Sequence, residues 1–272
     1  MPVSADCHMH SVHSGDSEAP MEEMILQSIA KGLDTICFTE HIDLDFPVTD
    51  LDPEGKFECD MDEYYKDYCI CRERYSDKIR ILFGTELGLQ PSVADRNKAY
   101  AKAYDLDLII GSSHLCNGAD PSCTDFYRGR SEKEAYREYF DSILENITTF
   151  SDFDVYGHLD YVVRYGPNAD KEYSYDTYRD ILDRILMLLI EKGKGIEINT
   201  GGLKKGLRDV HPCTDVIRRY KSLGGEIITI GSDAHIPENI AAYFSRAEEI
   251  LNICGFRYYT VFEHRRPRFV KL

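Results

Sequence analysis

The feature that most constrains the fold is a regular alternation of short apolar segments with amphipathic helical segments along the 272 residues. Seven segments rich in β-branched and other apolar residues, with a marginal eighth at 258–263, are spaced along the chain: 3–8, 34–41, 80–87, 107–114, 153–160, 195–200 and 226–235. Strands that alternate with helices predict a parallel sheet, because parallel neighbours need a crossover connection. Seven or eight such units in one chain indicate a barrel.

The helical segments carry start and stop signals that agree with this reading. They span 21–32, 131–150, 175–193 and 214–225. Residues 131–150 begin with Ser-x-x-Glu, the pattern of a capping box, and the first segment ends at Gly32. Two segments break the rhythm: residues 42–78, which are acidic and tyrosine-rich, and residues 115–130. We expect one barrel domain over 1–272, with these two insertions shaping its active-site face.

The overall charge and the cysteine content exclude several classes of protein. Acidic residues number 48 against 32 basic ones, for a formal net charge of −16, so a nucleic-acid backbone would be repelled. No apolar run approaches the length of a membrane span, and the N-terminus lacks the pattern of a signal peptide. The nine cysteines are scattered, without the spacing of a disulfide scaffold. We therefore expect a cytoplasmic protein with reduced thiols, bound to neither nucleic acid nor membrane.

Polar side chains stand at the C-terminal ends of the predicted strands. In chain order they are His8 and His10, Glu40 and His41, Glu86, His114, His158, Asn199, and Asp233 with His235. The C-terminal ends of parallel barrel strands open on one face, where active sites lie. A single histidine at a strand end is usually a packed or loop residue. Six of the nine histidines in such positions, together with Glu86 and Asp233, predict a metal site instead.

The donor types indicate which metals and which chemistry the site would serve. Imidazole and carboxylate groups suit zinc, manganese or iron. The set exceeds the three or four protein ligands of one catalytic ion, so we expect two or three divalent ions, with a carboxylate such as Glu86 bridging a pair. Clustered ions stabilise the attacking and leaving oxygens of phosphoryl displacement and supply hydroxide near neutral pH. Their charge also allows an acidic protein to bind an anionic phosphate.

Nine motifs together carry a family resemblance. They are D-x-H-x-H (6–10), SGDS-x-x-P (14–20), FTEHID (38–43), GTELG (84–88), GSSH (111–114), GHLDYVVRYGP (157–167), EINTGGLKKG (197–206), HP (211–212) and GGEIITIGSDAH (224–235). Over essentially its whole length the chain resembles the polymerase and histidinol phosphatase (PHP) superfamily, specifically its monofunctional histidinol-phosphatases. The resemblance implies a distorted (β/α)7 TIM-like barrel with a trinuclear metal centre at the C-terminal ends of the strands. It also implies hydrolysis of L-histidinol phosphate to L-histidinol and phosphate, in histidine biosynthesis.

The same resemblance implies a ligand set. One ion would be held by His8, His10, Glu86 and Asp233, a second by Glu86, His114 and His158, and a third by Asp16, His41 and His235. The match favours Asp16 over His13 as the ligand from the first loop, although other members can carry histidine at the position of Asp16. Glu86, Asp233, His235 and Arg164 are the expected catalytic residues.

Basic residues are expected to bind the substrate phosphate. Arg164 is the first choice, because a planar guanidinium can grip two phosphate oxygens. Lys204 stands where relatives often carry arginine, and it would supply charge without a bidentate fork. Arg128 and Arg130 are weaker choices for the same task. The 42–78 insertion is expected to receive the cationic amine and imidazole of histidinol.

Several roles stay open at this stage. The leaving group could receive its proton from a metal-bound water, from Asp160 or from His235. His211 precedes a proline at a helix start, where a capping or loop role is expected at least as much as metal binding, and His264 has no expected role.

Three other functions compete with the histidinol-phosphatase reading. The first is a PHP-type phosphoesterase acting on a different small phosphate ester or a nucleotide. The second is an amidohydrolase-like, metal-dependent C–N hydrolase, which typically needs a metal-bridging lysine at a strand end; no lysine stands there in this sequence. The third is a metal-storing scaffold, which would not need the phosphate-binding residues.

Overall fold

A computed structural model describes residues 3–272. Its main sheet has seven strands in the order of the chain, and every neighbouring pair is parallel. The strands are β1 (Ala5–Met9), β2 (Thr35–Ile42), β3 (Arg80–Gly88), β4 (Leu108–Ser112), β5 (Val155–Tyr156), β6 (Gly195–Asn199) and β7 (Ile228–Gly231). The predicted distorted (β/α)7 barrel is confirmed.

The sheet closes just beyond the last strand. The His10 N–H donates to the Ala234 carbonyl at 2.9 Å, and the Asp233 N–H donates to the His8 carbonyl at 2.9 Å. These bonds join the segment after β7 to the end of β1, at the C-terminal end of the barrel. Three of the four residues that make these bonds, His8, His10 and Asp233, are therefore also residues predicted to bind metal.

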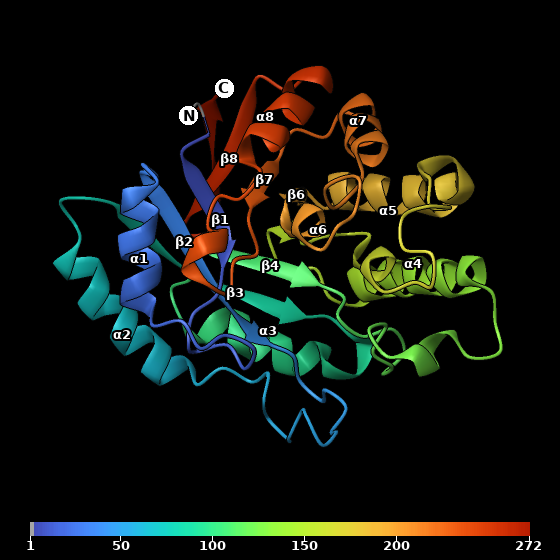
Figure 1. Ribbon diagram of the computed structural model, residues 1–272, viewed down its shortest axis with the longest axis horizontal. Coiled ribbons are helices and arrows are strands. Elements are labelled where there is room, and N and C mark those ends of the chain that lie inside the picture. The colour runs from blue at the N-terminus through green and yellow to red at the C-terminus, as the bar shows by residue number, and fades with distance from the viewer. Residues whose placement is uncertain (1–2) are drawn as a thin grey trace.

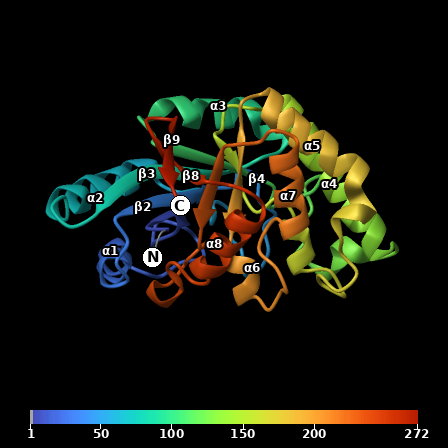
Figure 2. The same ribbon diagram turned by 90° about the horizontal axis from the view of Figure 1, so that it is seen from above.

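Helices surround the sheet, with α1 and α2 on one side and α4 and α5 on the opposite side (Figures 1 and 2). The α-helices are α1 (Met21–Ala30), α2 (Met61–Arg74), α3 (Ala94–Ala103), α4 (Glu132–Thr149), α5 (Arg179–Glu191), α6 (Gly201–Lys204), α7 (Thr214–Ser222) and α8 (Phe244–Ile253). The short 3-10 helices are η1 (Pro91–Val93), η2 (Thr124–Tyr127), η3 (Tyr161–Arg164), η4 (Tyr175–Tyr178) and η5 (Pro237–Asn239). The predicted capping box of α4 is present, with Ser131 and Glu134 exchanging hydrogen bonds.

The marginal eighth segment is not a barrel strand. It forms β8 (Tyr258–Glu263), which pairs antiparallel with β9 (Arg266–Lys271) in a separate hairpin. The turn of the hairpin is bound to residues that precede β4 and β5: the Arg265 N–H donates to the Asp107 carbonyl at 3.0 Å, and its guanidinium binds Asp152 at 3.1 Å. The hairpin thus packs at the N-terminal ends of the strands, opposite the metal-binding face.

The two insertions hold structure of their own. Helix α2 lies in the 42–78 insertion, where the Asp60 side chain caps its first N–H groups. Its Tyr64 hydroxyl donates to the backbone carbonyls of Phe38 and Gly84, which fastens the helix to β2 and β3. The 115–130 insertion contains η2. Within residues 3–272, the structure contains no helix with the length and apolar character needed to cross a bilayer.

Candidate metal centre

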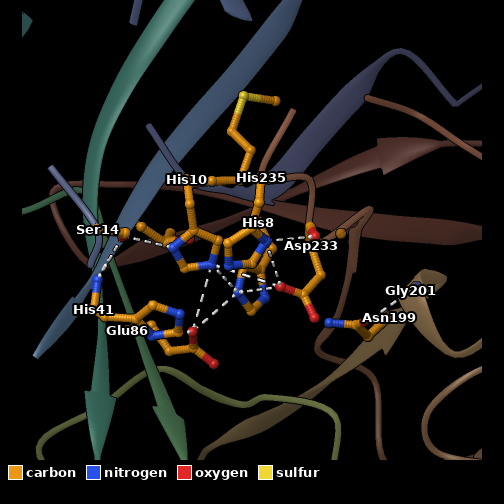
Figure 3. A network of polar contacts seen from close by, with 12 residues as sticks. His8, His10, Ser14, His41, Glu86, Asn199, Gly201, Asp233 and His235 are labelled. Atoms are coloured by element: carbon orange, nitrogen blue, oxygen red, sulfur yellow. Dashed lines mark hydrogen bonds and ion pairs between the residues drawn. The ribbon is translucent and has the colours of Figure 1, made fainter. Parts of the chain in front are cut away.

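The nine residues predicted to bind metal converge at the C-terminal ends of the strands. His8 lies in β1, His41 in β2 and Glu86 in β3, and the others follow strands: His10 and Asp16 after β1, His114 after β4, His158 after β5, and Asp233 and His235 after β7. Figure 3 shows imidazoles from several of these elements pointing toward Glu86 and Asp233. Predicted ligands from six strand ends thus meet at one place, as the parallel topology requires.

Glu86 lies at the middle of the cluster. Its Oε1 is 2.8 Å from His158 Nε2 and 3.2 Å from His114 Nε2. Its Oε2 is 3.1 Å from His41 Nδ1 and 3.2 Å from His8 Nε2. Each carboxylate oxygen thus faces its own pair of imidazoles, which is the arrangement of a bridging ligand.

His8 and His10 are arranged as a pair that could chelate one ion. They are two positions apart at the end of an extended strand, so both side chains leave the same face. Their Nε2 atoms are 3.1 Å apart, and Asp233 Oδ1 lies 3.8 Å from His8 Nε2 and 3.6 Å from His10 Nε2. These three residues can hold a divalent ion.

The remaining donors form overlapping groups. His114 and His158 present Nε2 atoms 3.4 Å apart. Asp16 places one oxygen 3.6 Å from His41 Nε2 and the other 3.1 Å from His235 Nε2. Two further sets can hold an ion: His10 with His41 and His235, and His41 with Glu86 and His114. His10 and His41 therefore each belong to two groups, whereas the ligand sets that the family resemblance implies share Glu86 alone.

The donor set fits divalent ions. Two imidazole nitrogens that face each other can share one N–H···N hydrogen bond, or both can donate a lone pair to one ion. His41 Nδ1 and His235 Nε2 are buried without a hydrogen-bond partner, although carboxylate oxygens lie 3.1 Å from each. Buried polar atoms are normally satisfied. Ions such as zinc, manganese or iron would satisfy these nitrogens.

Buried charges of opposite sign perturb the cluster's titration. Burial alone would raise the pKa of Glu86, but His8, His114 and His41 outweigh it and hold that pKa well below its usual range. Burial likewise opposes protonation of His114, yet Asp43 and Glu86 raise its pKa to about 10. The pKa values of His10 and His158 shift the other way, because burial lowers them.

A second layer of buried carboxylates orients the imidazoles, and the sequence did not reveal it. Glu197 accepts from His8 Nδ1 at 2.6 Å, and Asp43 accepts from His114 Nδ1 at 2.8 Å. Such partners fix the ring and raise its basicity as a ligand. The available signal was their position inside two of the quoted motifs, EINTGG and FTEHID, where a carboxylate occupies a buried strand or its end.

His10 is oriented through a hydroxyl. Its Nδ1 lies 2.9 Å from Ser14 Oγ, and that hydroxyl donates to Glu40 at 2.5 Å. Glu40, noted in the sequence only as a strand-end acid, therefore supports the cluster from behind.

Arg164, the last residue of η3, lies beside the cluster. Its Nη2 donates to Asp233 Oδ2 at 3.1 Å and to Asn199 Oδ1 at 3.2 Å, and its side chain is only 6 % exposed. The guanidinium lies 5.1 Å from the centre of the Tyr161 ring. Its Nε is buried without a partner. The guanidinium is thus held next to a predicted ligand with donor capacity to spare.

A cavity of about 450 Å³ opens above the cluster. It is lined by Asp16, His41, His114, His158, Asp233 and His235, by Arg164 and Lys204, by Phe46, Asp52 and Phe57 of the 42–78 insertion, and by Asp120 and Ser122 of the 115–130 insertion. The cavity therefore joins the predicted metal ligands to the predicted phosphate-binding residues and to an acidic and aromatic rim.

Three residues considered from the sequence lie away from the cavity and the cluster. Arg128 pairs with Asp125, and Arg130 pairs with Glu138, so both are engaged away from the cavity lining. His13 binds Asp67 at the surface of α2.

The expectations for Asp160 and His211 need correction. Asp160 is buried and bonded to His211, which removes it from the cavity and from the role of proton donor. His211 lies in the loop before α7 as expected, but its side chain does not cap that helix; it is buried against Asp160, because the loop after α6 folds back onto β6.

A seven-stranded parallel barrel with histidines and carboxylates gathered at the C-terminal strand ends is the architecture of a metal-dependent hydrolase. Residues 6–201 match the model of the PHP domain, and the chain belongs to the PHP domain family.

The chain is similar to histidinol-phosphatases over nearly its full length. It is 34% identical over 253 residues to a probable histidinol-phosphatase of Clostridium acetobutylicum, covering 93% of this chain and 94% of that protein. It is 34% identical to a histidinol-phosphatase of Lactococcus lactis, covering 92% and 91%. The crystal structure of histidinol phosphate phosphatase from Lactococcus lactis, complexed with zinc, L-histidinol and phosphate, superimposes with a TM-score of 0.88 at 32% identity, covering 97% of this chain and 98% of that one.

Proposed function

We propose that this protein is a metal-dependent histidinol-phosphatase, which hydrolyses L-histidinol phosphate to L-histidinol and phosphate in histidine biosynthesis. One observation carries the assignment: a structure with bound zinc, L-histidinol and phosphate matches 97% of the chain at a TM-score of 0.88. The converging donors support it, because they provide the metal-binding groups that such a reaction needs. The whole chain would act as one barrel domain.

The proposed ligands are the nine residues predicted from the sequence, holding two or three ions of zinc, manganese or iron: His8, His10, Asp16, His41, Glu86, His114, His158, Asp233 and His235. When bound, the ions supply Lewis-acid stabilisation of the phosphoryl oxygens and activate water. Glu86 provides the shared charge, since its two oxygens face different imidazole pairs. Glu197 and Asp43 keep the Nδ1 atoms of their histidines engaged, so that each Nε2 stays directed inward.

Arg164 would hold the substrate phosphate. Its guanidinium lies on the cavity wall with Nη2 fixed by Asp233 and Asn199, and the remaining N–H donors can meet phosphate oxygens as a fork. Lys204, exposed at the cavity edge, adds a second positive charge without fixed geometry. Both charges would stabilise the non-bridging oxygens as negative charge builds up in the transition state.

The rim of the cavity suits the cationic part of the substrate. Asp52 and Asp120 contribute carboxylates, and Phe46 and Phe57 contribute aromatic faces. An ammonium group and a flat imidazole are the groups that such a rim would receive. Of the two side chains considered as proton donor to the leaving alkoxide, only His235 lines the cavity.

A substrate comparison tests the assignment. We expect kcat/KM for L-histidinol phosphate to exceed that for p-nitrophenyl phosphate by about 100-fold, since only the former has a cation for the acidic rim. Equal values would refute the substrate assignment and favour another small phosphate ester or a nucleotide, which the same phosphate-release screen should include. Cleavage of C–N bonds without phosphate release would favour the amidohydrolase-like alternative.

The cytoplasm is the proposed location. The nine cysteines, all within residues 3–272, are free thiols, and none forms a disulfide in that range. Reduced thiols are typical of that compartment.

A further inference from the structure

Asp160 and His211 form a buried pair behind the wall that carries Arg164. Each is about 1 % exposed, and neither lines the cavity above the metal centre. The Asp160 carboxylate accepts a hydrogen bond from His211 Nδ1 through Oδ1 and a second from the Cys213 backbone N–H at 2.9 Å through Oδ2. A buried carboxylate is costly to desolvate, so these bonds must be maintained for the fold to tolerate it.

His211 is also joined to the end of β6 through its backbone. The Asn199 N–H donates to the His211 carbonyl at 2.7 Å, and the His211 N–H donates to the Asn199 carbonyl at 2.9 Å. The Asn199 side chain in turn accepts from Arg164 Nη2 at 3.2 Å and from the Gly201 N–H at 2.9 Å. Asn199 lies next to Asp233 in Figure 3.

The contacts form a closed ring. Asp160 directly precedes η3, and its carbonyl accepts from the Val163 N–H at 3.0 Å inside that turn. Arg164 ends the same turn and returns to Asn199. Starting from Asp160, the ring therefore runs through His211, Asn199 and Arg164 and back along η3.

The His211 ring also seats α6. A Cβ placed on Gly202 would lie 2.8 Å from His211 Cδ2, so only glycine allows this approach. Helix α6 carries Lys204 at its end. One imidazole consequently supports the backbone beneath both proposed phosphate-binding residues.

We propose that the Asp160–His211 pair is a positioning device that holds the Arg164 guanidinium, and with it α6, in the geometry that binds the substrate phosphate. The proposal rests on the phosphate-binding role proposed above for Arg164. A misplacement of a phosphate-binding group by about 1 Å can lower the rate by about 100-fold. A buried pair that positions this group can therefore affect the rate without contacting the reacting atoms.

Inorganic phosphate, a product of the proposed reaction, probes the site directly as a competitive inhibitor. In the metal-loaded enzyme, His211→Ala should raise the inhibition constant of phosphate by about tenfold, the equivalent of one charged hydrogen bond, with unchanged metal content. His211→Asn should restore most of the affinity, because its amide N–H can take the place of Nδ1–H toward Asp160. Where His211→Ala does not fold, Asp160→Asn replaces it, with a smaller effect in the same direction.

Two comparisons distinguish positioning from general destabilisation. Asp154→Asn removes a buried carboxylate that pairs with Arg265 near the opposite end of the barrel, and it should leave phosphate inhibition unchanged. In an Arg164→Ala background, His211→Ala should have a smaller effect, limited to the part carried through α6 and Lys204. An equal effect of His211→Ala in both backgrounds would overturn the proposal.

The outcomes also separate this proposal from the one beneath it. If Arg164→Ala itself leaves phosphate inhibition unchanged, the phosphate-binding role of Arg164 fails, and the positioning proposal fails with it. If Arg164→Ala weakens inhibition but neither His211→Ala nor Asp160→Asn does, the positioning proposal alone is wrong.

Discussion

Replacement of Glu86 by glutamine tests the centre of the proposed site. The change keeps shape and volume but removes the negative charge that lies within 3.2 Å of nitrogens from four imidazoles. Removing one partner from a buried charge cluster typically costs about 3–5 kcal/mol. At about 1.4 kcal/mol per tenfold change, metal affinity should fall roughly 10²–10⁴-fold.

The assay measures two quantities, metal content and kcat/KM. Purified Glu86→Gln, dialysed against a weak chelator, should lose metal on elemental analysis, and its kcat/KM for L-histidinol phosphate should fall by a factor in the same range. Glu145→Gln, the same chemical change on the exposed face of α4, is the matched control and should leave both unchanged. If Glu86→Gln keeps full metal content and activity within about twofold of the parent, the bridging role is refuted.

Three further predictions follow from the surroundings of the cluster. Glu197→Ala, which frees His8 Nδ1, should weaken metal binding by about 10–100-fold in a competition titration, and unchanged affinity would remove Glu197 from the support of the site. Because the pKa of His114 is raised to about 10, metal must displace a proton at neutral pH. Metal titration in weak buffer should therefore release protons, and affinity should rise as the pH increases toward that value; affinity that falls over this range would contradict the assignment of His114. Asp120→Asn should raise KM for L-histidinol phosphate but not for p-nitrophenyl phosphate. An equal change in KM for both would show that the rim does not bind the cationic part of the substrate.

The order of the chain was enough to predict the barrel and the face that carries the site. Strand segments that alternate with helical segments predict a parallel sheet. The C-terminal ends of parallel strands lie on one face, so strand-end residues such as His8 and His158 could be placed on the same face without coordinates. From the sequence alone, the segment 258–263 could not be distinguished from a barrel strand. An apolar run does not show whether the strand beside it is parallel or antiparallel.

The support of the site could not be predicted in the same way. Glu197 lies 189 residues from His8 in sequence, and the Asp160–His211 pair spans 51 residues. Such contacts depend on how loops fold over the strand ends, which a local sequence pattern does not predict. His158 illustrates the same limit: its strand has only two residues, and its own φ is +20°, so neither periodicity nor propensity fixes its orientation.

The central claim is that clustered metal ions on this barrel hydrolyse histidinol phosphate. The most direct test measures metal content per chain and phosphate release from L-histidinol phosphate in the same preparations, before chelation, after chelation and after metal is restored. We expect two to three ions per chain, with activity lost on chelation and recovered as zinc, manganese or iron is returned. A chelated protein without bound metal that still releases phosphate at the full rate would contradict it.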